Sequence, residues 1–367
     1  MGKRNRLASI IITAALMIAL LPATAFAADY DLWVGEVRVT DANKDNITGA
    51  SGVATFDSDT NTLTLDGFEY TGKGGSKFTV EDVGDAYAAV YSNIDNLKIT
   101  LKNENALTHT AYSGYDSYGI YAEKGLTITE ESTGTLDVAS ANDVNRSIGI
   151  YIRYNDFNVN GGEVTAVGGK AASTDLSSGI WCFDGNITVG ENVNLIGIGG
   201  EAGKSYGVCA FDKIINNGGT IEGTSGEAGY LSRGISLGTI ESTSEKSKII
   251  GTAGTSTGES AGIYIWNSAT FSKGHMKGIG GSSSTDESYG IYVNGDDKLT
   301  VIGGTVTAQG KTRNVVYLND GGEGEAIPAP DSSPNTGDNS NMILWLALLL
   351  VSGGVIIVAV VLGRKRK

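Results

Sequence analysis

The sequence predicts an all-β fold: a right-handed, single-stranded parallel β-helix, a three-sided solenoid of about 8 coils of about 28 residues. Three observations support this prediction. A short phrase centred on a glycine recurs along the chain, glycine is abundant (53) while proline is rare (4), and no proline lies between residues 23 and 327. Proline is excluded from central strands and glycine suits tight corners, so a long glycine-rich segment without proline favours many short strands.

The repeated phrase has the form SYGIYA, and its glycines are spaced 27 to 30 residues apart. Degenerate copies surround Val90 and Val316. Each repeat holds two further alternating runs separated by glycine-rich corners, which fits three short strands and leaves no room for a helix. A leucine-rich repeat would need a leucine ladder and a propeller blade would need a longer repeat, so the β-helix is favoured. The anchoring glycines are Gly119, Gly149, Gly179, Gly207, Gly234, Gly262 and Gly290.

Alternation within the phrase predicts which side chains face the interior, because side chains along a strand switch faces with period 2. The residue after each glycine is Ile or Val throughout, which indicates an inward row, and the third residue after it should also point inward. The second residue after it should then point outward. This outward row reads Tyr91, Tyr121, Tyr151, Trp181, Cys209, Ser236, Tyr264, Tyr292 and Tyr317. Cys182 and Cys209 therefore face opposite sides, and we expect two free thiols, Cys182 buried and Cys209 at the surface.

The N-terminus has the pattern of a secretory signal peptide over residues 1–27. Basic residues precede an apolar run, and the small-residue site Ala25-Phe26-Ala27 predicts cleavage between Ala27 and Ala28. Residues 28–80 do not fit the repeat. We expect them to form an N-terminal β cap that covers the open end of the solenoid, with the repeats spanning 81–318.

The C-terminus predicts a membrane-spanning helix over 342–362 and a basic cytoplasmic tail over 363–367. Before it come a flexible spacer (319–332) and the sequence Ser-Pro-Asn-Thr-Gly at 333–337. This layout resembles the LPxTG-like cell-wall sorting signal of Gram-positive surface proteins, with Ser333 where that family has Leu. The resemblance implies that a sortase recognises Pro334, cleaves between Thr336 and Gly337, and links the chain covalently to peptidoglycan at the cell surface.

The outward aromatic residues form the candidate ligand face. On neighbouring coils about 4.8 Å apart, they would make a track along the solenoid. Such a track suits stacking on sugar rings, although stacking for stability alone explains the same pattern. The candidate residues are Tyr121, Tyr151, Trp181, Phe183, Phe211, Tyr264, Trp266 and Tyr292.

Asp184 and Asp212 occupy the same offset on adjacent coils and are candidates for a Ca²⁺ site or an acid/base pair, or are simply solvated corner residues. The two histidines, His109 and His275, lie far apart in the repeat order, and no zinc-type spacing is present. No catalytic residues are predicted, and no cofactor is expected beyond this candidate Ca²⁺.

The net charge of −14 disfavours nucleic acid and other anionic polymers as partners and favours neutral glycans or host surface ligands. The repeats resemble the pectate-lyase-like β-helices, and the opening DLWVGEVRVT is similar to secreted proteins labelled carbohydrate-binding. The resemblance implies a non-catalytic carbohydrate-binding or adhesive module. A β-helix polysaccharide lyase or glycoside hydrolase, and a passive stalk, are the alternatives.

Overall fold

The computed structural model describes residues 28–75, 77–80, 84–110, 114–285, 287–295 and 297–311. The predicted signal peptide, wall spacer, sorting motif, membrane span and basic tail lie outside these residues. Within the described ranges, no helix has the length and apolar character needed to cross a membrane.

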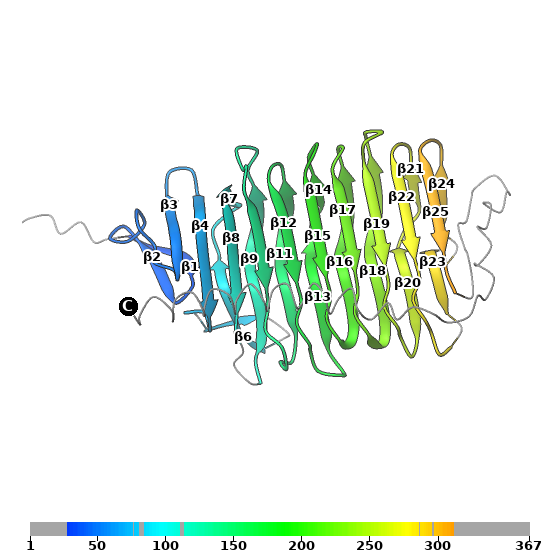
Figure 1. Cartoon of the computed structure of the whole chain (residues 1–367), viewed down its shortest axis with the longest axis horizontal. Coiled ribbons are helices and arrows are strands. Elements are labelled where there is room, and N and C mark those ends of the chain that lie inside the picture. Colours follow the sequence, from blue (N-terminus) through cyan, green and yellow to red (C-terminus); the bar gives the residue numbers. More distant parts are fainter. Residues whose placement is uncertain are drawn as a thin grey trace, which may run out of the picture. The chain divides into compact units, whose positions relative to one another are not determined.

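The described chain is an all-β parallel β-solenoid of about 8 turns, which confirms the predicted fold class (Figure 1). Its strands stack in three parallel columns, which we call the first, second and third faces. The first face carries the repeated phrase, with Ile150 of one coil opposite Ile180 of the next and Trp181 opposite Cys209. Its strands are β6 (Gly84–Ser92), β9 (Asp116–Ile128), β11 (Ser147–Val159), β13 (Leu176–Asp184), β16 (Ala202–Asn216), β18 (Ala228–Ser242), β20 (Glu259–Ile265) and β23 (Ser288–Val293).

The second and third faces complete each coil. Strands β9, β11, β16 and β18 are long because they continue around the corner into the second face. The other second-face strands are β7 (Leu97–Lys102), β14 (Ile187–Val189), β21 (Ala269–Phe271) and β24 (Leu299–Val301). The third face contains β8 (Glu104–His109), β10 (Thr135–Ala139), β12 (Glu163–Val167), β15 (Asn194–Ile198), β17 (Thr220–Thr224), β19 (Lys248–Thr252), β22 (His275–Ile279) and β25 (Thr305–Gln309).

The interior is one continuous apolar cluster, as the alternation predicts. The Ile and Val residues that follow the anchoring glycines are fully buried there, among them Ile120, Ile180 and Ile263. Side chains of the third face, such as Leu195 and Ile221, belong to the same cluster. Burial of such a row on every coil is the main apolar contribution to folding.

The anchoring glycine is required because the first face approaches the third face closely at this point. A Cβ added to Gly207 would lie 2.2 Å from the backbone nitrogen of Thr224, and one added to Gly179 would lie 2.1 Å from that of Ile198. No side chain fits at these distances, which explains why every complete copy of the phrase has glycine here.

The serine that begins the phrase links adjacent coils. Ser177 is fully buried, its hydroxyl donates to the Gly169 carbonyl (2.7 Å), and the same oxygen accepts from the Gly200 amide of the next coil (2.8 Å). Ser147 and Ser260 repeat both bonds at their own corners. These hydroxyls satisfy backbone groups that the turn at each corner leaves unpaired.

The N-terminal end consists of antiparallel strands. Strand β1 (Asp29–Val34) pairs with β2 (Val37–Thr40) and β6, while β3 (Ser51–Asp57) pairs with β4 (Thr62–Gly72) and β5 (Lys77–Val80) with β6. Strand β4 also makes the first parallel pairings, with β7 and β8.

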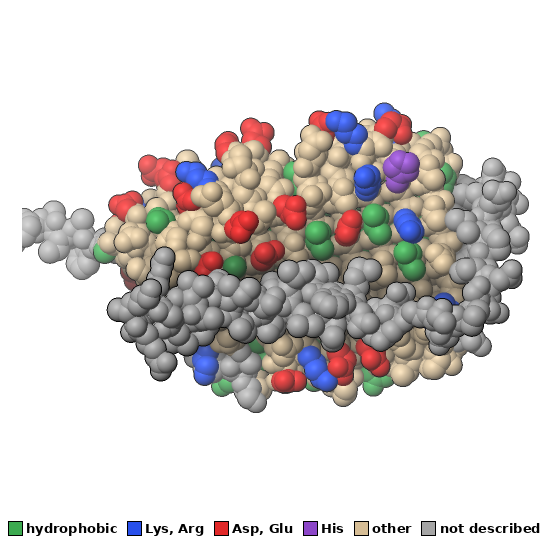
Figure 2. Space-filling view, in the orientation of Figure 1, with side chains coloured by type: hydrophobic (Ala, Val, Ile, Leu, Met, Phe, Trp, Pro, Cys, Tyr) green, Lys and Arg blue, Asp and Glu red, His purple; other side chains and the backbone are tan. Residues whose placement is uncertain are grey.

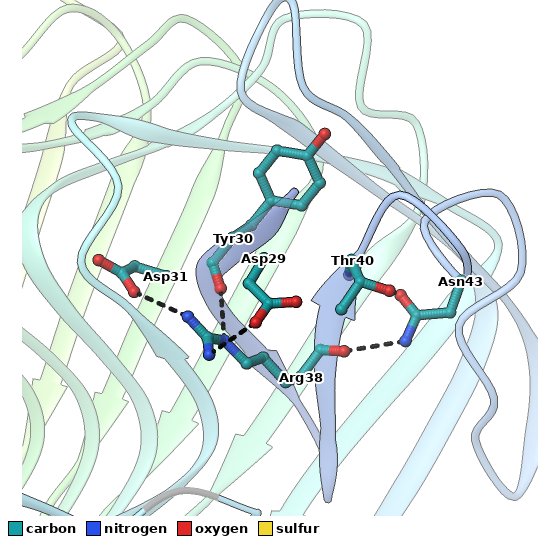
Figure 3. Close-up of polar contacts among 6 residues, drawn as sticks. All are labelled: Asp29, Tyr30, Asp31, Arg38, Thr40 and Asn43. Carbon is teal, nitrogen blue, oxygen red and sulfur yellow. Dashed lines mark hydrogen bonds and ion pairs between the residues drawn. The ribbon is translucent and has the colours of Figure 1, made fainter. Parts of the chain in front are cut away.

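An arginine ties β1 to β2 (Figure 3). Arg38 donates to the Tyr30 carbonyl and forms ion pairs with Asp29 and Asp31, and its own carbonyl accepts from Asn43.

Candidate functional site

The aromatic row lies on the outer side of the first face, separate from the interior cluster, but it is less exposed than expected. Tyr121 is 1 % exposed, Tyr151 is 6 % and Tyr264 is 4 %. Rings on successive coils stack on one another, with 5.2 Å between the centroids of Tyr121 and Tyr151 and 5.1 Å between those of Tyr264 and Tyr292. Coil spacing brings ring faces into contact, so each ring helps to cover its neighbours.

The expectation that Cys209 lies at the surface is wrong. Both cysteines are free and buried, and Cys209 is only 1 % exposed. It does face away from the interior, in the outer cluster with Tyr206 and Trp181, whereas Cys182 belongs to the interior cluster. The direction predicted from alternation is therefore correct for both cysteines, but the small Cys209 side chain is enclosed by the large rings of its row.

Small side chains at Cys209 and Ser236 interrupt the aromatic row on two adjacent coils. The outer apolar residues accordingly form two clusters, one that includes Tyr121 and Tyr151 and one that includes Tyr264 and Tyr289. Trp266 leans back toward the interruption, and its indole nitrogen donates to the Ser236 hydroxyl (3.1 Å).

A groove of about 720 Å³ lies at this interruption. Five of the eight predicted ligand-face residues line it. Phe183 and Phe211 are the most exposed of these, at 47 % and 39 %. We call this site the aromatic groove. Its lining comprises Arg146, Tyr151, Arg153, Tyr154, Thr174, Asp175, Leu176, Trp181, Phe183, Lys204, Tyr206, Phe211, Leu231 and Trp266.

The remaining predicted ligand-face residues, Tyr121, Tyr264 and Tyr292, are not part of this lining. Tyr121 and Tyr264 are buried in the clusters on either side of the groove, and Tyr292 is half-buried against Tyr264.

Arg146 marks one end of the groove. Its Nε lies 3.4 Å from an Asp175 carboxylate oxygen and 4.0 Å from one of Asp116. Burial raises the pKa of Asp116 to about 6, although the Arg146 charge opposes this shift. The Tyr118 hydroxyl also donates to Asp116.

Arg153 and Lys204 add two more positive charges to the lining. Arg153 forms an ion pair with Glu123 (3.2 Å) and lies over the ring of Tyr154 (5.0 Å). Burial raises the pKa of Tyr151 to about 12. Lys204 is exposed on β16, opposite Leu176 on one side and Leu231 on the other.

Asp184 and Asp212 lie outside the groove lining. Both are exposed, and the ladder between their strands extends only to the pair Cys182–Ala210. Within the described ranges, no group of three or more His, Cys, Asp or Glu side chains is placed to hold a metal ion.

Sequence reasoning did not place Arg146 or Lys204 in the candidate site, although a signal for both was present. Arg146, Leu176, Lys204 and Leu231 all lie three residues before an anchoring glycine, so they form one row along the groove. Reading the phrase one residue further upstream would have found this row.

Comparisons with protein-family models, curated proteins and solved structures find no match to this chain.

Proposed function

We propose that this protein is a cell-wall-anchored surface protein of a Gram-positive bacterium and that its solenoid is a non-catalytic carbohydrate-binding or adhesive module. The aromatic groove is the observation that carries the binding proposal. It combines half-buried indoles with exposed phenyl rings and a few polar groups. Mostly apolar concave sites with a small number of placed polar groups are typical of ligand-binding sites.

The anchoring part of the proposal rests on the sequence at both ends of the chain. A signal peptidase would cleave before Ala28, and a sortase would join the Thr336 carbonyl to peptidoglycan after release of Gly337. In a Gram-positive host, Thr336→Ala should move the protein from the wall fraction to the membrane fraction. Recovery of this variant in the wall fraction at the wild-type level would refute sortase anchoring.

The binding part is tested by glycan-array screening of the purified full-length chain in detergent. Trp181→Ala should abolish binding, because it removes an indole from the floor of the groove. Tyr230→Ala is the matched control, since Tyr230 is 54 % exposed but does not line the groove. Equal losses in the two variants would argue against the groove as the binding site.

Assays for reducing sugars and for unsaturated products, run on the glycans that bind, separate this proposal from an enzyme. Turnover that Asp184→Asn abolishes would favour a lyase or hydrolase. Absence of binding to every glycan on the array would favour a stalk or a protein ligand.

A further inference from the structure

The aromatic groove differs in charge from the rest of the molecule. The chain carries a net charge of −14, and Asp and Glu side chains are spread over the coils on the face shown in Figure 2. Among the residues that the structure describes, the charged ones that line the groove are instead three cations, Arg146, Arg153 and Lys204, and one carboxylate, Asp175. A ligand in the groove therefore meets mainly positive side chains.

Protein carboxylates hold two of these cations but not the third. Arg146 is paired with Asp175, and Arg153 with Glu123. The Lys204 ammonium forms no hydrogen bond or ion pair with any residue in the described part of the chain, although the backbone amide of Lys204 donates to the Asp175 carbonyl, and the side chain is exposed at the groove. Its ammonium group is therefore free to bind a ligand.

A fourth cation lies beside the C-terminal wall of the groove. The guanidinium of Arg233 lies 3.3 Å from the centroid of the Tyr264 ring and 4.9 Å from that of Trp266. Its Nε donates to Glu259 (2.7 Å), while its Nη1 is buried without a hydrogen-bond partner among the described residues. The residue is 3 % exposed, and its charge is paired with the Glu259 carboxylate.

We propose, on the basis of the binding function proposed above, that the aromatic groove selects glycans whose sugars carry carboxylates. The sugar ring stacks on the aromatic floor, and a carboxylate accepts a charge-assisted hydrogen bond from the Lys204 ammonium. The negative charges elsewhere on the protein do not prevent this, because at physiological ionic strength the Debye length is about 8 Å. The local charge of the groove, and not the net charge of the chain, then determines which ligand binds.

The test compares two ligands that differ only at C6 of each sugar, where one carries a carboxylate and the other a neutral hydroxymethyl group. The full-length chain in detergent is titrated calorimetrically with an oligoglucuronate and with the glucose oligosaccharide of the same linkage and length. The oligoglucuronate should bind about tenfold more tightly, since a hydrogen bond between charged groups is worth more than one between neutral groups.

Lys204→Met keeps the length and apolar stem of the side chain but removes the charge. It should weaken oligoglucuronate binding by about tenfold and leave binding of the neutral oligosaccharide unchanged. Lys277→Met is the matched control, because Lys277 is an exposed lysine on the third face. It should change neither affinity.

The outcomes distinguish this inference from the proposed function. Equal binding of the two oligosaccharides, or a similar loss of both in Lys204→Met, overturns the charge selectivity and leaves carbohydrate binding standing. Absence of binding to both ligands and to every glycan on the array overturns both. Tighter binding of the glucuronate that Lys204→Met removes selectively supports both.

Discussion

The buried serines that begin the repeated phrase, among them Ser147, Ser177 and Ser260, form a column along the solenoid, which we call the serine column. Removing the Ser177 hydroxyl tests whether this column holds neighbouring coils together. Ser177→Ala leaves the carbonyl of Gly169 without its 2.7 Å donor and the amide of Gly200 without its 2.8 Å acceptor. Both backbone groups lie where the first and third faces meet, and the serine itself is fully buried. Water cannot readily replace the lost hydroxyl there.

The expected loss of stability follows from these two contacts. A buried polar group that loses its partner costs about 1–3 kcal/mol. Two such groups, one of them only half-buried at Gly200, give a loss of about 2–4 kcal/mol in the free energy of unfolding. Urea denaturation followed by far-UV circular dichroism measures it.

Ser268→Ala is the matched control. The Ser268 hydroxyl also makes two hydrogen bonds, to Asp297 (2.7 Å) and from the Lys298 amide (3.2 Å), but the residue is exposed. Water can replace both bonds, so the loss should stay within about 0.5 kcal/mol. If the two variants lose the same stability, or if Ser177→Ala loses less than about 1 kcal/mol, the buried hydroxyl of Ser177 does not stabilise the contact between coils as we infer.

Three further predictions concern stability. Gly207→Ala should lower the free energy of unfolding by about 1–3 kcal/mol in urea denaturation, because its Cβ would lie 2.2 Å from the Thr224 nitrogen. Gly229→Ala is the control and should be close to neutral, since the nearest atom to its Cβ would lie 3.5 Å away. The pKa of Asp116 is raised from 3.8 to about 6 in the folded state, so its contribution to stability is greatest below pH 4 and is lost as the pH rises through 6. At pH 7, Asp116→Asn should therefore be about 1–3 kcal/mol more stable than wild type in urea denaturation, and this difference should vanish below pH 4. Burial lowers the pKa of His109 from 6.5 to about 4, so its contribution to stability is present above pH 6.5 and is lost as the pH falls toward 4. His109→Gln should therefore flatten the dependence of the free energy of unfolding on pH between these two values. An unchanged slope would contradict the lowered pKa of His109.

The fold was predictable because the sequence repeats one local rule on every coil. The glycine spacing sets the coil length, and the inward Ile or Val beside each glycine sets the register, so both follow from residues that are visible without coordinates. The degenerate copy at Val90 also pairs as expected, with Val90 opposite Ile120.

Exposure was not predictable in the same way, because it depends on the size of the neighbours as well as on direction. Cys209 points outward as expected, yet the larger side chains around it enclose it. The groove itself results from two small residues following Trp181 in the row, and its charge comes from residues such as Lys204 that lie upstream of the repeated phrase. Direction can be read from alternation, but a hollow depends on side chains of several coils together.

The interruption of the aromatic row has a consequence for how this chain can change in length. A solenoid whose coils contact chiefly their neighbours tolerates the gain or loss of whole coils, and extra coils before Tyr121 or after Tyr292 would leave the hollow intact. Loss of the two coils that carry Cys209 and Ser236 would instead bring Trp181 beside Tyr264 and close the gap with a continuous stack of rings. Natural length variants of this chain should therefore keep ligand binding only where those two coils survive, whatever their total number of coils.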